Sequence, residues 1–159
     1  MKITLSTIIL SLGILMSNLY AQMPGNMSQP DFNAEKAAGI FQYDIVKVTE
    51  KLKIIDDSTM AKVTKSLNDY NSRMSELSIL HGETFKKIES EFDRNIQIAI
   101  SNRDRSKMDG VKAEIQRIIP PIRKQVQEYE VLLNSKMANY LTESQNKKWL
   151  RYQNSMKTN

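Results

Sequence analysis

Few residues in this chain of 159 are of the types that carry out catalysis. There is no cysteine and only one histidine, His81, which excludes disulfides, thiol catalysis and a zinc site built from cysteine and histidine. A histidine-based triad would have to use His81, but this residue falls on an apolar helical stripe, where we expect a packed or interface role. No glycine-rich phosphate loop occurs in the sequence. We therefore predict a protein that is not an enzyme and that carries no cofactor.

Metal binding would need several histidine, methionine or carboxylate ligands that converge. Met23 and Met27 could form a loose copper(I) pair, because thioethers suit this soft ion. Two methionines in a polar leader more often have no such role. His81 and Glu83 are two residues apart, so they do not share a face of a helix. A metal-sensing accessory protein is therefore a weaker hypothesis than a protein-binding module.

The other elements must be arranged around the stretch from Met60 to Ala99. Its apolar residues recur at steps of three and four, which is the pattern of one face of a helix. At about 1.5 Å per residue this helix would be roughly 60 Å long, more than a single thin protomer can bury. Gly82 is its weak point, so we expect either one helix bent near Gly82 or two coaxial helices. The stripe consists of Met60, Val63, Leu67, Tyr70, Met74, Leu77, His81, Phe85, Ile88, Phe92, Ile96 and Ala99.

The N-terminal segment has the features of a secretory signal peptide. Lys2 precedes an uncharged and mostly apolar run over residues 3–16, which is short for a membrane span, and Ala21 is the small residue at the expected cut. The alternative is a retained N-terminal anchor. We predict a signal peptide over residues 1–21, a flexible leader over 22–32 and a single all-helical domain over 33–157.

Two further helices flank the central one. Apolar residues at helical spacing from Ala34 to Leu52 predict a first helix that is weakened at Gly39 and ends near Ile54 or Ile55. A return helix is predicted from Val111 to Tyr140, after a reversal at residues 102–107 or 109–110 with Ser106 as its cap. Its apolar stripe consists of Val111, Ile115, Ile118, Ile122, Val126, Tyr129, Leu133, Met137 and Tyr140. Pro120 and Pro121 lie in its middle and predict a kink or a broken turn, after which the helix resumes.

The most specific local pattern is formed by Leu141, Thr142 and Gln145. Thr142 is predicted to be an N-cap whose hydroxyl accepts from the amide of Gln145, while the Gln145 side chain reaches back to the amide of Thr142. Leu141 precedes the cap, and Trp149 continues the buried face of the helix that follows. The turn before the central helix repeats this arrangement in residue type, with Ile55, Asp56 and Thr59 in the corresponding places.

Signal peptide, absence of cysteine, all-helical pattern and a helix-starting Leu-Thr-x-x-Gln together resemble the Spy/CpxP family of periplasmic proteins. That family is marked by two LTxxQ motifs, each of which opens a helix. Here the second motif is intact at Leu141, Thr142 and Gln145, whereas Ile55, Asp56 and Thr59 match the first motif in type but not in letter. These residues are mainly structural in the family, and we carry them over as structural only.

The resemblance implies a thin, bent four-helix protomer, and two protomers paired antiparallel into a cradle. It also implies an ATP-independent chaperone that holds unfolded clients on a basic, partly apolar concave face; other members are envelope-stress regulators or metal-sensing accessories. We therefore predict an all-α fold, an elongated and bent helical hairpin or four-helix protomer with one long central helix, as an antiparallel dimer. The predicted location is the periplasm.

Charge clustering indicates where clients would bind. The candidate residues, with exposed apolar neighbours, are Arg105, Lys107, Arg117, Arg123 and Lys124. The alternative is an ordinary solvated helix face. We expect unfolded or partly folded envelope proteins as partners, together with a second copy of the chain, and no stable membrane anchor. Nucleic acid is disfavoured by export and by the modest balance of 23 basic against 18 acidic residues. The competing function is an envelope regulator or scaffold that binds one specific protein.

Overall fold

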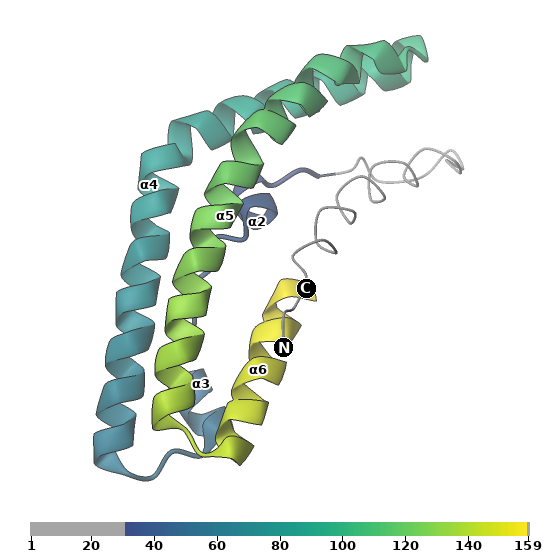
Figure 1. The fold of residues 1–159 in the computed structure, drawn as a ribbon. Helices are drawn as coiled ribbons and strands as arrows, with labels where there is room; N and C mark the ends of the chain where they lie inside the picture. Colours follow the sequence, from purple (N-terminus) through teal and green to yellow (C-terminus); the bar gives the residue numbers. More distant parts are fainter. Residues whose placement is uncertain (1–30, 159) are drawn as a thin grey trace, which may run out of the picture. The chain divides into compact units, whose positions relative to one another are not determined.

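The structure, a computed structural model, describes residues 31–158. The regular secondary structure of this part of the chain is all helical and includes no strand, which confirms the predicted all-α class with one long central helix (Figure 1). The predicted signal peptide (residues 1–21), most of the predicted leader, and Met23 and Met27 lie outside the described residues. The described elements are the α-helices α2 (Ala34–Ala38), α3 (Ile45–Leu52), α4 (Asp57–Asn102), α5 (Asp109–Tyr140) and α6 (Glu143–Thr158), and the 3-10 helix η1 (Arg105–Met108).

The central helix α4 is continuous over 46 residues, roughly 70 Å of helix. It runs through Gly82 without a break and changes direction near its middle, so the single bent helix is the arrangement that the chain adopts (Figure 1). The predicted stripe is buried except at Met60 and His81, which are partly exposed. The ring of His81 lies 5.8 Å from that of Phe85, so the only histidine is a packing residue.

Helix α5 returns along α4 to complete a long hairpin (Figure 1). It contains both Pro120 and Pro121 but remains one helix, so the alternative of a broken turn is wrong. The predicted kink is present, because α5 changes direction in its N-terminal half, the half that holds both prolines (Figure 1). Both proline side chains are exposed, and water can therefore hydrate the backbone carbonyls that lose their helical partners.

The buried face of α5 differs from the prediction at three positions, one of which is Tyr140, whose side chain is only partly buried. Ile119 is buried in place of Ile118, and Glu130 is buried in place of Tyr129. A bend changes the helical phase, which accounts for the shift of one residue beside the prolines. Glu130 can be buried because the Nζ atom of Lys157 lies 2.7 Å from its Oε2 atom. A buried carboxylate is tolerated when it is paired in this way.

The predicted first helix is in fact two helices joined by an extended segment. Gly39 ends α2 in the left-handed conformation, with φ of 79°, and Asp44 begins α3 by accepting a hydrogen bond from the Lys47 amide at 3.0 Å. The connection is held by Asn71 of α4, which exchanges two 2.8 Å hydrogen bonds with the backbone of Tyr43. Helical spacing alone did not reveal this break, because both halves keep apolar residues at similar steps.

The reversal between α4 and α5 lies within the predicted range, but its cap is a different residue. Arg103 leaves α4 in the left-handed conformation, with φ of 52°. The Asp104 carboxylate then accepts from the amide of Ser106 at 3.0 Å, so Asp104 caps η1 and Ser106 is its donor. Helix α5 itself begins after Met108 without a side-chain cap. The reason is that the aspartate comes first after the turn, and a carboxylate is a strong acceptor at a helix start.

Helix α6 packs against α3 and α5 (Figure 1). The Trp149 and Tyr43 rings meet edge to face with their centroids 4.9 Å apart, and the Tyr43 and Tyr70 rings lie 5.2 Å apart. Trp149 is 0 % exposed and Tyr43 is 2 % exposed. This aromatic cluster therefore fixes α6 and the segment between α2 and α3 onto the hairpin.

Candidate protein-binding surface

The start of α6 contains both hydrogen bonds of the expected capping box. The amide of Gln145 donates to Oγ1 of Thr142 at 3.3 Å, and the amide of Thr142 donates to Oε1 of Gln145 at 3.0 Å. Leu141 is buried just before the cap. These contacts satisfy backbone amides at the helix start and set the turn from α5 into α6. The motif therefore has a structural role in this chain.

The start of α4 uses a simpler cap. The Asp56 carboxylate accepts from the amide of Thr59 at 2.7 Å, and hydrogen bonds from Thr59 lower the pKa of Asp56. Val63 is fully buried, as is Trp149 at the corresponding place after the second motif. Ile55 differs from Leu141, because its side chain is 95 % exposed. The two turns thus share a capping side chain and a buried residue in the helix that follows. The residue before the cap, however, faces solvent in the turn before α4.

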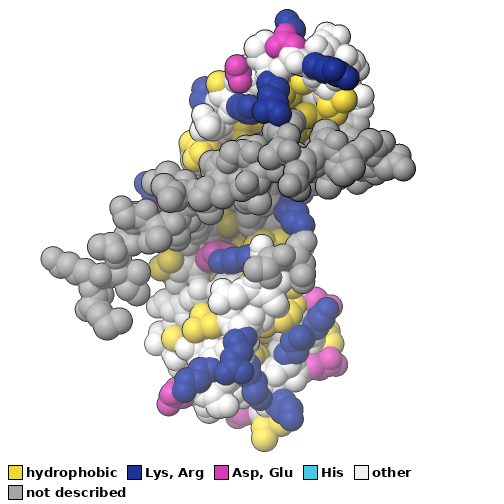
Figure 2. Space-filling model, turned by 90° about the vertical axis from the view of Figure 1, so that its right-hand side faces the viewer, with side chains coloured by type: hydrophobic (Ala, Val, Ile, Leu, Met, Phe, Trp, Pro, Cys, Tyr) yellow, Lys and Arg dark blue, Asp and Glu magenta, His cyan; other side chains and the backbone are white. Residues whose placement is uncertain are grey.

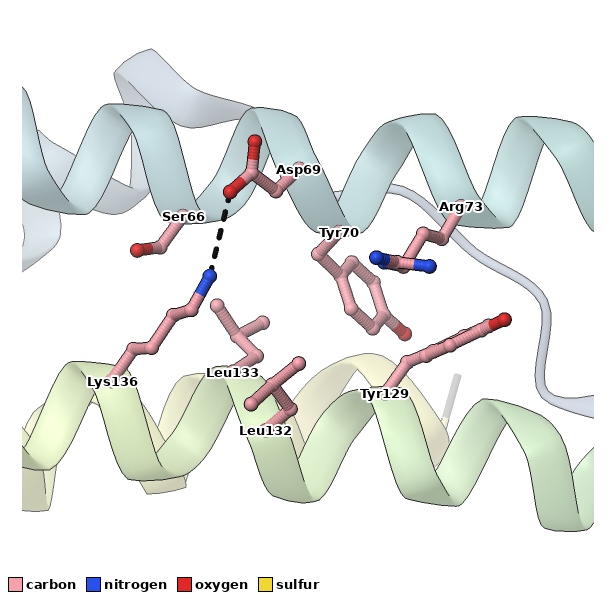
Figure 3. Close-up of a pocket in the computed structure, with 8 residues that line it drawn as sticks. All are labelled: Ser66, Asp69, Tyr70, Arg73, Tyr129, Leu132, Leu133 and Lys136. Atoms are coloured by element: carbon pink, nitrogen blue, oxygen red, sulfur yellow. Dashed lines mark hydrogen bonds and ion pairs between the residues drawn. The ribbon is translucent and has the colours of Figure 1, made fainter.

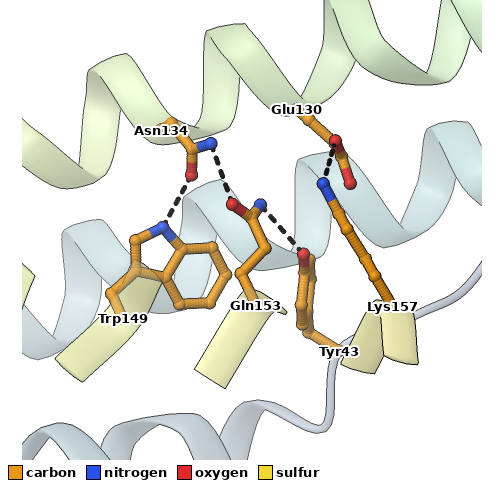
Figure 4. A network of polar contacts seen from close by, with 6 residues as sticks. All are labelled: Tyr43, Glu130, Asn134, Trp149, Gln153 and Lys157. Atoms are coloured by element: carbon orange, nitrogen blue, oxygen red, sulfur yellow. Dashed lines mark hydrogen bonds and ion pairs between the residues drawn. The ribbon is translucent and has the colours of Figure 1, made fainter. Parts of the chain in front are cut away.

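A chain of polar side chains joins α6 to α5 and to the segment before α3 (Figure 4). Trp149 donates from Nε1 to Oδ1 of Asn134 at 2.7 Å, and Asn134 donates from Nδ2 to Oε1 of Gln153 at 3.0 Å. Gln153 donates from Nε2 to the hydroxyl of Tyr43 at 3.1 Å. Burial raises the pKa of Tyr43, so this hydroxyl stays protonated at neutral pH. The members are mutually satisfied, which suits a structural role.

A small cleft lies between α4 and α5 (Figure 3). Its volume is about 50 Å³, far below the several hundred Å³ of a typical small-molecule site. Lys136 Nζ lies 3.4 Å from Oδ2 of Asp69, and the Arg73 guanidinium lies 4.9 Å from the centroid of the Tyr129 ring. Its lining residues are Ser66, Asp69, Tyr70, Arg73, Tyr129, Leu132, Leu133 and Lys136. These contacts tie the two helices together and leave no room for a substrate.

The five basic residues predicted to contact clients do not form one patch. Arg105 and Lys107 belong to η1 at the end of the hairpin, whereas the other three lie along α5. Arg117 is 3.5 Å from the carboxylate of Glu114, and Lys124 is exposed. Clustering in the sequence did not translate into clustering in space, because η1 and the α5 residues are separated by several turns of helix.

Arg123 has a structural contact. It is half-buried and donates from Nε to the backbone carbonyl of Ala37 at 3.0 Å, and its Nη2 also donates to this oxygen. Burial lowers the pKa of Arg123. The guanidinium thus satisfies a carbonyl near the end of α2, where cations are favourable. No sequence signal identifies this contact, since the two residues are 86 positions apart.

Large aliphatic side chains are exposed along the hairpin and around α3 and α6. Ile79 and its neighbour Leu80 lie on α4 and are 82 % and 74 % exposed, and Val131 and its neighbour Leu132 form a similar pair on α5. Single exposed aliphatics are common on soluble proteins, but adjacent pairs indicate contact surfaces more strongly. Over residues 31–158 the set consists of Val46, Ile55, Ile79, Leu80, Ile98, Ile100, Val131, Leu132 and Leu150.

A second group of cations is brought together by the packing of α3 on α6. The Lys51 ammonium lies 5.2 Å from the centroid of the Tyr152 ring, which joins the two helices. Lys47 is one turn before Lys51 on α3, and Lys148 is one turn before Tyr152 on α6, so each lies on the same side as this contact. We call Lys47, Lys51, Lys148 and Arg151 the α3–α6 basic patch.

The face seen in Figure 2 displays this concentration of positive charge. Dark-blue side chains gather in its lower part, at the height at which Figure 1 places α3 and α6. Within the described residues no ion pair involves a member of the α3–α6 basic patch. Only the tertiary structure brings the lysines of α3 beside the cations of α6.

Residues 31–158 contain no group of three or more acidic or histidine side chains placed to hold a metal ion. In the same part of the chain, none of the helices combines the length and the apolar character that a membrane span requires.

Comparison of the chain with models of protein families, with characterised proteins and with solved structures finds no match in any of the three.

Proposed function

We propose that this chain is an exported, non-enzymatic chaperone-like protein that holds partly unfolded envelope proteins without ATP. The resemblance to the Spy/CpxP family, made by the N-terminal segment and by Leu141, Thr142 and Gln145, supports this proposal. Export to the periplasm rests on the signal-peptide pattern of residues 1–21. The antiparallel homodimer is part of the same proposal, and sedimentation of the purified protein at several concentrations tests it.

The observation that carries the proposal is the set of exposed aliphatic side chains along a long hairpin that also bears many cations. Ile79, Leu80 and Val131 are each at least 70 % exposed. Contact with apolar segments of a client contributes roughly 25 cal/mol per Å² that is removed from water. Surface cations speed the encounter with acidic stretches. Scattered contacts of this kind bind many unfolded chains weakly, which is what holding requires.

The test is suppression of aggregation by the purified protein, without ATP, for two unrelated unfolding clients followed by light scattering. Suppression of both at near-stoichiometric amounts supports the proposal. Suppression of neither by a folded, helical sample overturns it and favours a regulator or scaffold with one specific partner. That alternative function is then tested by capture of a single folded envelope protein with a fixed stoichiometry.

A pair of matched variants locates the surface. The double variant Ile79→Ser with Leu80→Ser removes exposed aliphatics whose loss costs the fold little. The control variant, Lys65→Ser with Asn68→Ser, changes two exposed polar residues of the same helix. We expect weaker suppression from the first variant and unchanged suppression from the second. Equal activity of both variants would remove this pair of residues from the binding surface.

A further inference from the structure

The positive charge of the α3–α6 basic patch is not neutralised by neighbouring carboxylates. Its four cations make no ion pair among the described residues, and Lys147 beside it is paired with Glu143 at 2.7 Å. Two carboxylates lie near these cations: Glu50 is exposed one turn after Lys47 on α3, and Asp44 contributes to the raised pKa of Tyr152. The Asp44 carboxylate already accepts from the backbone amide of Lys47 at the start of α3. Positive charge therefore exceeds negative charge on this surface, and it is available to an external anion.

Exposed aliphatic side chains accompany this charge on the same two helices and on the turn after α3. Ile55 is 95 % exposed in the turn that follows α3, Val46 of α3 is 65 % exposed, and Leu150 of α6 is 41 % exposed. Lys53, which ends α3 in the left-handed conformation with φ of 52°, stands beside this turn. Long lysine side chains can keep their ammonium groups in water while their stems cover apolar material.

The α3–α6 basic patch is separate from the hollows that the structure describes between α4 and α5 and beside α2. The cleft between α4 and α5 and the two hollows that border α2 include no member of the α3–α6 basic patch. Helix-in-groove and strand-addition partners need a groove or a sheet edge. A broad anionic surface needs only unpaired cations and side chains that can enter an apolar layer.

We propose that the α3–α6 basic patch docks this protein reversibly onto the anionic headgroups of a lipid membrane, with Ile55 entering the boundary between headgroups and acyl chains. The four cations bind the lipid phosphates, and the exposed isoleucine adds apolar contact at the edge of the patch. The described helices supply no membrane span, so the association is peripheral and depends on salt. This inference is independent of the proposed chaperone activity.

The test is co-sedimentation of the purified protein with lipid vesicles. We expect binding to vesicles that contain phosphatidylglycerol mixed with phosphatidylcholine, and none to vesicles of pure phosphatidylcholine. Binding should fall as salt is raised, because exposed charges are screened. Failure to bind the anionic vesicles at low salt would overturn the proposal.

Two charge-reversal variants separate the patch from overall charge. Lys47→Glu with Lys148→Glu should weaken binding about tenfold or more, because each cation near an anionic surface contributes appreciably. The control, Lys65→Glu with Arg94→Glu, makes the same change in net charge at exposed sites on α4 and should bind nearly as well as the unaltered protein. Circular dichroism confirms that both variants remain helical. Equal losses in the two variants would show a response to net charge alone and would overturn the assignment to this patch.

A third variant tests the apolar component. Ile55→Ser removes an aliphatic side chain that is 95 % exposed, so the fold should be unaffected. We expect the variant to bind anionic vesicles at low salt, but more weakly than the unaltered protein. It should dissociate from them at a lower salt concentration than the unaltered protein does. Binding of an acidic polypeptide such as polyglutamate, without binding to anionic vesicles, would reject the membrane and identify an acidic protein as the partner.

Discussion

Arg123 of α5 donates from Nε to the backbone carbonyl of Ala37 at 3.0 Å and thereby joins α5 to the end of α2. Hydrogen bonds from charged donors stabilise a folded protein by roughly 1.5–3 kcal/mol. We therefore expect Arg123→Ala to lower the free energy of unfolding by about this amount. The measurement is urea unfolding followed by circular dichroism. Lys124→Ala, at the exposed neighbouring position, is the control and should change stability by less than about 0.5 kcal/mol. An equal loss of stability in the two variants would show that the hydrogen bonds of Arg123 do not stabilise the fold.

Asn134 bridges Trp149 and Gln153 through hydrogen bonds of 2.7 and 3.0 Å. Replacing it by alanine leaves the indole N–H and an amide oxygen without partners, and each buried unsatisfied group costs about 1–3 kcal/mol. We expect Asn134→Ala to destabilise the protein and to shift the fluorescence of its single tryptophan to longer wavelength. Asn139→Ala changes an exposed asparagine of the same helix and should do neither. An unshifted spectrum in Asn134→Ala would show that α6 is held by apolar packing alone.

Thr142 begins α6 through the capping box with Gln145. Loss of a threonine N-cap costs about 0.5–2 kcal/mol. Thr142→Ala should therefore lower the unfolding midpoint in urea, whereas Ser144→Ala in the first turn of the same helix should leave it nearly unchanged. A midpoint that is the same in both variants would contradict a structural part for the LTxxQ pattern.

Two glycines should respond in opposite directions to alanine. A Cβ atom at Gly82 would meet nothing within 4 Å beyond its own turn of helix, and α4 is continuous there, so Gly82→Ala should stabilise the protein by up to about 1 kcal/mol. Gly39 has φ of 79°, where a side chain costs about 1–2 kcal/mol. Thermal unfolding of both variants checks this contrast. A loss of stability in Gly82→Ala would show that the bend of α4 depends on its glycine.

Asp56 should make stability depend on pH. Hydrogen bonds from Thr59 hold the pKa of the folded Asp56 below that of the unfolded chain. Its contribution is therefore fully present at neutral pH and is lost as the pH falls below about 4, through the folded pKa. Asp56→Asn keeps an acceptor for the cap without the titration. Thermal unfolding at about pH 6 and about pH 3 should show a smaller decrease for this variant, and an equal decrease would assign the acid sensitivity to other carboxylates.

Much of the fold could be predicted from local patterns. Local patterns predict the stripe from Val63 to Ala99, the return helix and the capping box at Thr142. Each depends on residues within one or two helical turns, so it can be recognised from the sequence alone. The predictions were wrong where two signals competed. Gly39 divided the expected first helix because a left-handed residue ends a helix whatever the spacing around it, and Asp104 took the cap that was assigned to Ser106.

The sequence by itself determined the class of the fold, the long central helix and the lack of cysteine chemistry, because composition and helical periodicity are properties of the chain. Only the tertiary structure decided which cations lie together. Arg123 is engaged by a carbonyl 86 residues away, whereas Lys51 approaches Tyr152 from a different helix. Contacts between distant segments depend on how helices pack, and helix packing is set by side chains that no local pattern relates to one another.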